Sequence, residues 1–289
     1  MNILLIGKNG QVGYELERCL QGLGNIIAVD RKRMDLTNPD QIREVIHAVK
    51  PKLILNAAAY TSVDLAESEP ELAMRINALA PQIIAEESKR LGAVMIHYST
   101  DYVFDGSKVD PYTEDDLTCP INVYGRTKRE GELAIEATGV THLILRTSWV
   151  YGMRGANFLR TVLQLTETSE ELRIVRDQQG SPTWCRTVAE STAHIVAQSR
   201  ATLDSQDWWG QRSGTYHLAA QGHTSRFAFA EAIIMHPAVR KKPVVVPIVT
   251  GDFRVAARRP LNSVLDCSRF ISMFGCLPDW KTGLQLCLE

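Results

Sequence analysis

The sequence lacks the signatures of several protein classes. Its six cysteines include no C-x-x-C pair, which argues against zinc sites and redox dithiols, and neither H-E-x-x-H nor G-x-S-x-G occurs. No segment approaches the roughly 20 apolar residues that cross a bilayer, and no basic stretch precedes the short apolar run at residues 3–6. We therefore expect a cytoplasmic protein with reduced, mostly buried thiols and no membrane partner.

The chain also lacks an excess of charge. Lys and Arg total 32 and Asp and Glu total 33, so the formal net charge is −1. A general nucleic-acid binder normally has a basic excess, so we expect no nucleic-acid partner. With 289 residues, 45% hydrophobic and 22% charged, the chain has the composition of a globular protein with one large domain or a domain and a second lobe.

Hydrophobic periodicity predicts alternating strands and helices in the first half. The pattern predicts strands at residues 2–6, 26–30, 53–58, 94–99 and 143–148, and helices at 12–23, 39–49, 69–91 and 123–137. Such repeated strand–helix–strand units form parallel sheets with helices on both faces. We therefore predict an α/β fold with a doubly wound, Rossmann-like parallel sheet.

The pattern becomes less regular after residue 151. We expect helices near 157–166, 188–199 and 227–235, short strands near 215–219 and 244–248, and a loop at 205–214. This division predicts a dinucleotide-binding domain at residues 1–150. Residues 151–289 would form a smaller C-terminal lobe, with some segments returning to the first domain and an approximate boundary.

A glycine-rich turn lies between the first predicted strand and helix. Gly7, Gly10 and Gly13 spell G-x-x-G-x-x-G, where the chain can approach a pyrophosphate and the helix start offers free N–H groups. The alternative is a tight turn without a ligand. Asp30 ends the second strand, where an acid can bind the adenosine ribose, and residues 31–33 (Arg-Lys-Arg) could hold a 2′-phosphate instead. These residues therefore predict that the protein accepts either NADH or NADPH as its cofactor.

Tyr124 and Lys128 form a Y-x-x-x-K pair on one face of a predicted helix. A free phenol has a pKa near 10, and a nearby cation would lower it toward the range useful for proton transfer. The alternative is a pair on the helix surface. The preceding strand ends in Thr100 and Asp101, and Thr100 can hydrogen-bond the same ligand oxygen as Tyr124.

Several longer runs point to one family. They are N-A-A-A-Y-T at 56–61, S-T-D-Y-V-F-D-G at 99–106, R-T-S-W-V-Y at 146–151, Q-G-S-P-T at 179–183 and A-R-R-P-L-N-S at 257–263. The chain resembles the dTDP-4-dehydrorhamnose reductase family of the short-chain dehydrogenase/reductase superfamily from residue 3 to about residue 281. The resemblance implies NAD(P)H-dependent reduction of a dTDP-4-keto-sugar at C4, in the dTDP-rhamnose synthesis that supplies cell-surface polysaccharides such as O antigen.

The resemblance also implies roles for individual residues. The implied cofactor contacts are Gly7, Gly10, Gln11, Val12 and Gly13 at the pyrophosphate, Asp30 at the ribose, Asp35 and Leu36 near the adenine, and Ala59, Tyr60 and Thr61 beside the nicotinamide half. Tyr124 would be the general acid, and Lys128 would bind the nicotinamide ribose and lower the Tyr124 pKa. Thr100, Asp101 and Trp149 would contact the sugar nucleotide, although a core role for Trp149 is the alternative.

The metal site, the oligomer and the product stay open at this point. Some relatives are thought to dimerise through magnesium held by glutamates, and Glu15 matches the first of these. Arg186 stands at the second position and would repel a cation, and Glu289 is the last residue where the third glutamate would be expected. We therefore assign no metal ligand. Both a magnesium ion and a homodimer stay open. Two alternative functions also stay open. The chain could be a reductase that gives the C4 epimer (dTDP-6-deoxy-L-talose), or a non-catalytic regulatory subunit similar to methionine adenosyltransferase beta.

Overall fold

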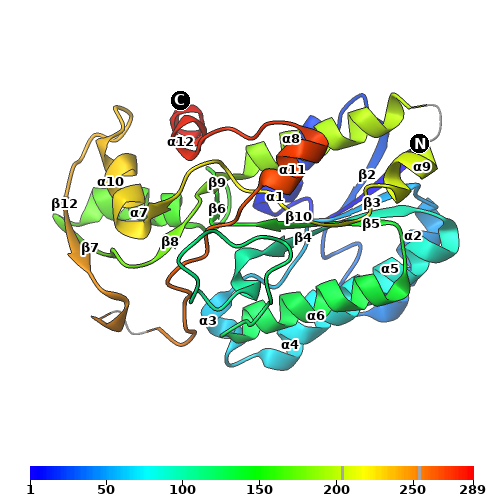
Figure 1. The fold of residues 1–289 in the computed structure, drawn as a ribbon, viewed down its shortest axis with the longest axis horizontal. Coiled ribbons are helices and arrows are strands. Elements are labelled where there is room, and N and C mark those ends of the chain that lie inside the picture. The colour runs from blue at the N-terminus through cyan, green and yellow to red at the C-terminus, as the bar shows by residue number, and fades with distance from the viewer. Residues whose placement is uncertain (203–204, 253–254) are drawn as a thin grey trace.

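A six-stranded sheet forms the centre of the computed structural model, which describes residues 1–202, 205–252 and 255–289. The strands lie in the order β10-β5-β4-β3-β1-β2, and every pairing is parallel (Figure 1). They are β1 (Asn2–Ile6), β2 (Asn25–Val29), β3 (Leu53–Asn56), β4 (Val94–Thr100), β5 (His142–Thr147) and β10 (Gly214–His217). The predicted parallel α/β sheet is confirmed.

Helices cover both faces of this sheet because the side chains of its strands alternate between two cores. In β1, Ile3 and Leu5 belong to one buried cluster, whereas Leu4 and Ile6 belong to the other. The first face is covered by α1 (Gln11–Cys19), α8 (Cys185–Arg200), α9 (Ser205–Gly210) and α11 (Ser268–Phe274). The second is covered by α2 (Pro39–Val49), α5 (Ala80–Leu91) and α6 (Val123–Thr138) (Figure 1).

The strand order reverses direction beside β1. The chain passes from β1 to β2 on one side and then crosses to β3 on the other side of β1. In open α/β sheets, ligands bind outside the carboxyl ends of the strands at such a switch point. The turns that follow β1 and β3 therefore flank the expected ligand crevice.

A second group of short elements has a core of its own. Tyr151, Phe229 and Trp280 are among its buried side chains, and it lies at the left of Figure 1. Its helices are α7 (Phe158–Thr168), α10 (Arg226–Met235) and α12 (Trp280–Leu288). Its strands form three pairs, which are β7 (Glu171–Val175) with β12 (Val244–Ile248), β6 (Val150–Tyr151) with β9 (Thr183–Trp184), and β8 (Gln179–Gly180) with β11 (Thr224–Ser225).

The segment predicted as one helix at 69–91 has a more complex form. After the short helix α3 (Val63–Ala66) come α4 (Pro70–Met74), a π-helical turn (Arg75–Leu79) and then α5. Short 3₁₀ turns occur at Asp101–Val103 and Thr250–Asp252. The helical prediction is right in extent, but the sequence pattern gave no signal for the π turn, which recurs at functional sites in proteins.

The prediction of a loop at 205–214 is wrong. Residues 205–210 form α9, because Trp208 and Trp209 pack into the core on the first face of the sheet with only 9% and 6% of their surface exposed. The strand predicted at 215–219 is present as β10, at the edge of the sheet beside β5.

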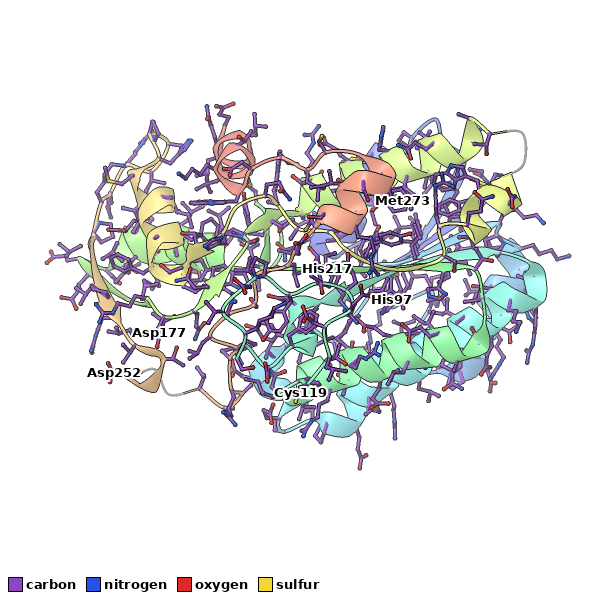
Figure 2. The ribbon with its side chains drawn as sticks, viewed as in Figure 1. His97, Cys119, Asp177, His217, Asp252 and Met273 are labelled. Atoms are coloured by element: carbon purple, nitrogen blue, oxygen red, sulfur yellow. The ribbon has the colours of Figure 1, made fainter. Side chains whose placement is uncertain are left out.

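The cysteines are free thiols, as predicted, but fewer are buried than expected. Cys185, Cys267 and Cys287 are buried, whereas Cys119 and Cys276 are exposed; Figure 2 marks Cys119 in the loop before α6. In the described part of the chain, no helix is long and apolar enough to span a membrane.

Candidate active site

In the glycine-rich turn between β1 and α1, the first and third glycines allow backbone segments to pack against each other at distances that leave no room for a Cβ. A Cβ on Gly7, which has φ +90°, would lie 2.8 Å from the Ala58 nitrogen, and one on Gly13 would lie 2.1 Å from the Gly7 oxygen. Gly10 differs, because a Cβ there would meet only the Gly7 oxygen at 3.4 Å. Gly10 is the N-cap of α1 and caps it with no side-chain hydrogen bond. The start of α1 thus offers backbone N–H groups, and the turn fits a phosphate group.

The acid expected at the adenosine ribose lies directly after β2. Asp30 accepts hydrogen bonds from the Asn9 amide at 3.2 Å and from the Lys32 backbone at 3.1 Å. Desolvation raises the pKa of Asp30, but these bonds and one from the Arg33 backbone outweigh it and lower the pKa. The carboxylate is therefore ionised and tied to the glycine-rich turn through Asn9.

The basic run after Asp30 is partly engaged with Asp35. The Arg31 guanidinium lies 3.4 Å from the Asp35 carboxylate, which also accepts hydrogen bonds from the backbone and hydroxyl of Thr37 at 2.9 and 2.8 Å. The backbone bond from Thr37 is the main cause that lowers the pKa of Asp35. Leu36, also expected near the adenine, is 8% exposed and packs in the core between the sheet and α2.

The segment after β3 is clamped by the π turn. Asn77 accepts a hydrogen bond from the Tyr60 nitrogen at 2.8 Å and donates to the Tyr60 oxygen at 3.1 Å. The same amide donates to Thr127 on α6 at 3.1 Å. The Tyr60 hydroxyl donates to Glu69 at 2.6 Å, which raises the pKa of Tyr60 to about 12. The Tyr60 backbone is therefore fixed at the switch point by the Asn77 side chain.

Tyr124 and Thr100 meet at the carboxyl end of β4. Tyr124 is in the first turn of α6, half-buried, and its ring packs edge-on against Tyr102 at 5.9 Å between centroids. Thr100 hydrogen-bonds the Tyr124 phenol and donates to the Asp101 carboxylate at 3.0 Å. Asp101 also accepts from Ser148 at 2.9 Å and is 2% exposed. In this structure Asp101 orients hydroxyl groups and presents little surface to a ligand.

Lys128 lies one turn after Tyr124 and is buried, with 1% of its surface exposed. Its ammonium donates to the Tyr98 carbonyl at 2.7 Å and contacts His97 Nε2 at 3.1 Å. Burial lowers the pKa of Lys128 to about 8, although Glu132 opposes that shift. These two partners take two of the three N–H groups of the ammonium.

His97 was not assigned a role from the sequence, yet it is the side chain that contacts Lys128. His97, labelled in Figure 2, is fully buried in β4. It also contacts the Asn56 amide on β3 at 3.1 Å. Burial, with the charge of Lys128 beside it, lowers the pKa of His97 far below its usual value. A neutral imidazole can accept a hydrogen bond from an ammonium.

The expected effect of Lys128 on Tyr124 is not present in this structure. Burial raises the pKa of the Tyr124 phenol, the Thr100 hydrogen bond lowers it, and Asp101 and Tyr102 raise it further. The Lys128 ammonium is directed toward β4 instead, at the Tyr98 carbonyl and His97. Lys128 is not among the groups that set the Tyr124 pKa in this structure, and its expected effect on the phenol stays a prediction.

Trp149 follows β5 and is packed against Arg226. Its φ of +45° is a conformation that L-residues adopt rarely, and 9% of its surface is exposed. The Arg226 guanidinium lies 3.6 Å from the ring centroid, and a Cβ on Gly180 would be 2.3 Å from the indole. Trp149 therefore joins β8 and α10 of the second group of elements to the end of β5.

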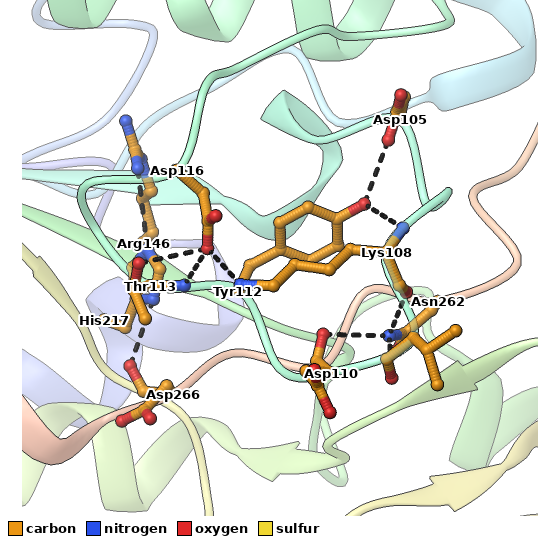
Figure 3. Close-up of polar contacts among 11 residues, drawn as sticks. Asp105, Lys108, Asp110, Tyr112, Thr113, Asp116, Arg146, His217, Asn262 and Asp266 are labelled. Carbon is orange, nitrogen blue, oxygen red and sulfur yellow. Dashed lines mark hydrogen bonds and ion pairs between the residues drawn. The ribbon is translucent and has the colours of Figure 1, made fainter.

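Two of the family-specific runs meet in one hydrogen-bonded cluster (Figure 3). The Tyr112 hydroxyl donates to Asp105 at 2.9 Å, and the Asn262 amide donates to the Lys108 carbonyl at 2.8 Å. A Cβ on Gly106 would lie 2.7 Å from the Leu261 nitrogen. The S-T-D-Y-V-F-D-G and A-R-R-P-L-N-S runs thus fix one another's loops beside the strand ends.

The position expected for a bridging metal holds an ion pair. Arg186 donates to Glu190 at 2.8 Å, one turn further along α8. Within residues 1–202, 205–252 and 255–289, no group of three or more His, Cys, Asp or Glu side chains is placed to hold a metal ion.

Comparison with known proteins extends over the whole chain. A family model described as the RmlD substrate binding domain matches residues 1–289. Curated dTDP-4-dehydrorhamnose reductases from Burkholderia thailandensis and Escherichia coli K12 are each 44% identical over 100% of this chain and 98% and 97% of their own lengths. A crystal structure of dTDP-4-dehydrorhamnose reductase from Bacillus anthracis in complex with NADP is 34% identical, covers 99% of this chain and 98% of that chain, and has a TM-score of 0.91.

Proposed function

The chain belongs to the RmlD family of dTDP-4-dehydrorhamnose reductases, and we propose on that premise that it reduces the C4 keto group of dTDP-4-dehydro-L-rhamnose to give dTDP-L-rhamnose. The single observation that carries this assignment is the assembly of Thr100, Tyr124 and Lys128 at one strand end, in a chain 44% identical to such reductases. A bound NADPH or NADH supplies the hydride for the reduction.

Tyr124 is the proposed proton donor. Because burial raises its pKa, the phenol stays protonated at neutral pH and can protonate the C4 oxygen as that oxygen gains charge. Thr100 lies beside the Tyr124 phenol, and its hydroxyl, which donates to Asp101 here, would turn to donate to the same oxygen when the substrate binds. Correct positioning of these groups contributes to the rate because it removes orientational freedom from the reacting pair.

The cofactor residues are proposed from their positions around the switch point. The N–H groups of Gln11 and Val12 would receive the diphosphate, and Gly10, whose own N–H donates to the Gly7 carbonyl at 3.0 Å, would allow its close approach. Asp30 would bind the adenosine ribose. Asp35 and Leu36 would lie near the adenine, Ala59, Tyr60 and Thr61 would flank the nicotinamide half, and the third N–H group of Lys128 would bind the nicotinamide ribose. Gly7 and Gly13 act by closing the turn.

The substrate is proposed to lie between the strand ends and the elements after residue 151. Trp149, held by Arg226, would contact the sugar nucleotide at this junction together with Thr100 and Asp101. The division into residues 1–150 and a substrate-binding lobe at 151–289 remains a prediction, as do a homodimer and a cytoplasmic location. Sedimentation of the purified protein would test whether it is a homodimer.

The direct test mixes purified protein with NADPH and dTDP-4-dehydro-L-rhamnose and follows the nicotinamide absorbance. We expect turnover without a partner protein, and an NMR spectrum of the product that shows the rhamno configuration at C4. Absence of turnover, with binding to a second protein, would support the regulatory alternative. The talo configuration would assign the chain to the C4-epimer reductases.

A further inference from the structure

The loop that joins β6 to α7, at residues 152–157, lies directly against the glycine-rich turn. The Asn157 amide donates to the Gln11 side-chain oxygen at 2.8 Å, and Arg154 Nε donates to the Asn9 carbonyl at 3.4 Å. Gln11 and Asn9 stand on either side of Gly10, the N-cap of α1. A loop from the second half of the chain therefore contacts the proposed diphosphate site.

This loop has a fixed shape. The Asn157 amide nitrogen also lies 2.8 Å from the Gly152 carbonyl and 3.1 Å from the Arg154 carbonyl, so its two N–H groups are shared among three acceptors. Arg160 donates to the Gly155 carbonyl at 2.8 Å. Gly155 has φ +73°, and a Cβ there would lie 3.2 Å from the Gln11 side chain. Both the conformation and the close approach favour glycine at this position.

Arg154 brings an unneutralised cation to the turn. Its guanidinium lies 4.3 Å from the centroid of the Tyr14 ring on α1, and Arg18 lies 3.3 Å from the same ring. Arg154 is exposed, and it forms no ion pair with any carboxylate in the described ranges. With a net charge of −1 for the whole chain, an anionic ligand depends on such local cations.

Asn9 extends this contact to the ribose acid. Its carbonyl accepts from Arg154, and its amide donates to Asp30 at 3.2 Å. The Arg154–Asn9–Asp30 chain therefore connects the loop to both parts of the proposed adenosine diphosphate site.

We propose that residues 152–157 are part of the cofactor site, with Arg154 supplying positive charge to the dinucleotide diphosphate and Asn157 holding Gln11 in place. The inference rests on the proposed function, because it takes the nicotinamide dinucleotide as the ligand. It adds that the elements after residue 151 contribute to binding the cofactor as well as the sugar nucleotide.

The experiment measures the Kd of NADPH by fluorescence titration, without substrate. Arg154→Ala should raise Kd about two- to fivefold, as expected for one exposed charge contact, and Arg154→Lys should restore part of the affinity. Arg18→Ala is the matched control, because it removes the other guanidinium from the Tyr14 ring, and should change Kd less than twofold. Raising the KCl concentration should weaken binding more in the wild type than in Arg154→Ala.

Asn157→Ser tests the second contact. Serine keeps an acceptor for the Arg160 nitrogen, which Asn157 caps at 3.1 Å, but it loses the amide that reaches Gln11. We expect a slightly lowered thermal midpoint, because the bonds to the Gly152 and Arg154 carbonyls are lost as well, and a Kd raised about threefold. If Arg154→Ala and Asn157→Ser both bind NADPH like the wild type, the inference is wrong. If the wild type neither binds NADPH nor turns over the keto sugar, the proposed function has failed instead.

Discussion

The glycine-rich turn after β1 and the cluster of Thr100, Tyr124, Lys128 and His97 at the end of β4 are built differently: the turn depends on its backbone and the cluster on its side chains. At the turn, glycines let backbone atoms approach one another, and a single Cβ on Gly13 would overlap the Gly7 oxygen at 2.1 Å. In the cluster, buried side chains make the contacts, and His97 lies 3.1 Å from the Lys128 ammonium and 3.1 Å from the Asn56 amide. The turn is therefore sensitive to added atoms, whereas the cluster is sensitive to removed functional groups.

The two regions also treat charge differently. Asp30 and Asp35 accept several hydrogen bonds near the surface, which lower their pKa and keep them ionised. Burial acts in the opposite sense on Tyr124 and Lys128, because it raises the pKa of the phenol and lowers that of the ammonium. The turn thus suits charged ligand groups, and the cluster suits proton transfer.

The largest effect should follow removal of one oxygen from the cluster. Tyr124→Phe deletes the proposed proton donor, so we expect kcat/KM to fall about 10³-fold, within the range typical of a lost general acid. The Kd of NADPH should stay within twofold of wild type. Turnover near the wild-type rate would show that the cluster does not act through this side chain.

The next largest effect should follow addition of one carbon to the turn. Gly13→Ala must displace the Gly7 carbonyl, so we expect it to weaken NADPH binding by about 100-fold or to lower the thermal midpoint. Gly10→Ala is the matched control, since its Cβ would meet only the Gly7 oxygen at 3.4 Å, and a much smaller effect is expected. Equal effects of the two variants would contradict the different roles assigned to the glycines.

We expect the pH dependence of kcat/KM to follow the ionisation of the Lys128 ammonium. The charged form exists below its pKa of about 8, so kcat/KM should fall as the pH rises through that value. Tyr124 does not explain this limb, because its pKa is raised and the phenol remains protonated there. His97→Phe removes an acceptor from the ammonium and should move the limb to lower pH by up to about one unit.

A second variant distinguishes charge from packing in that experiment. His97→Gln retains an acceptor near Lys128 and should return the limb toward its wild-type position. A limb at the same pH in His97→Phe as in the wild type would show that His97 does not support the charge of Lys128.

The smallest effect is expected at the exposed basic run after β2. Arg33 is exposed, whereas Arg31 is paired with Asp35 at 3.4 Å, so Arg33 is the better candidate for a ribose 2′-phosphate. Arg33→Ala should raise the KM for NADPH about threefold and leave the KM for NADH unchanged. Equal changes for both cofactors would remove the proposed role of this side chain.

The periodic elements and the local motifs could be predicted from the sequence. The helix at 39–49 matches α2 at both ends, because Asn38 caps it and Pro39 starts it. The glycine-rich turn and the Y-x-x-x-K pair are local patterns, and the sheet brings them to one edge as expected. The roles given to these residues remain predictions.

The parts that could not be predicted depend on contacts between distant segments. His97, Asn56 and Lys128 come from β4, β3 and α6, so no local pattern links them. The helix α9 was missed because the burial of Trp208 and Trp209 is decided by the sheet that they cover. In the same way, the contact of Arg154 with Asn9 joins residues 145 positions apart.

The π turn at residues 75–79 makes the helix around it sensitive to length. It directs Asn77 toward both Tyr60 and Thr127, and Gly131 on α6 leaves room for the Asn77 carbonyl, which would lie 2.1 Å from a Cβ there. Deleting one residue from this turn would restore the regular α-helical period and rotate Asn77 by roughly 100° about the axis. Substitutions on the outer surface of this helix should therefore be tolerated more readily than any insertion or deletion within it.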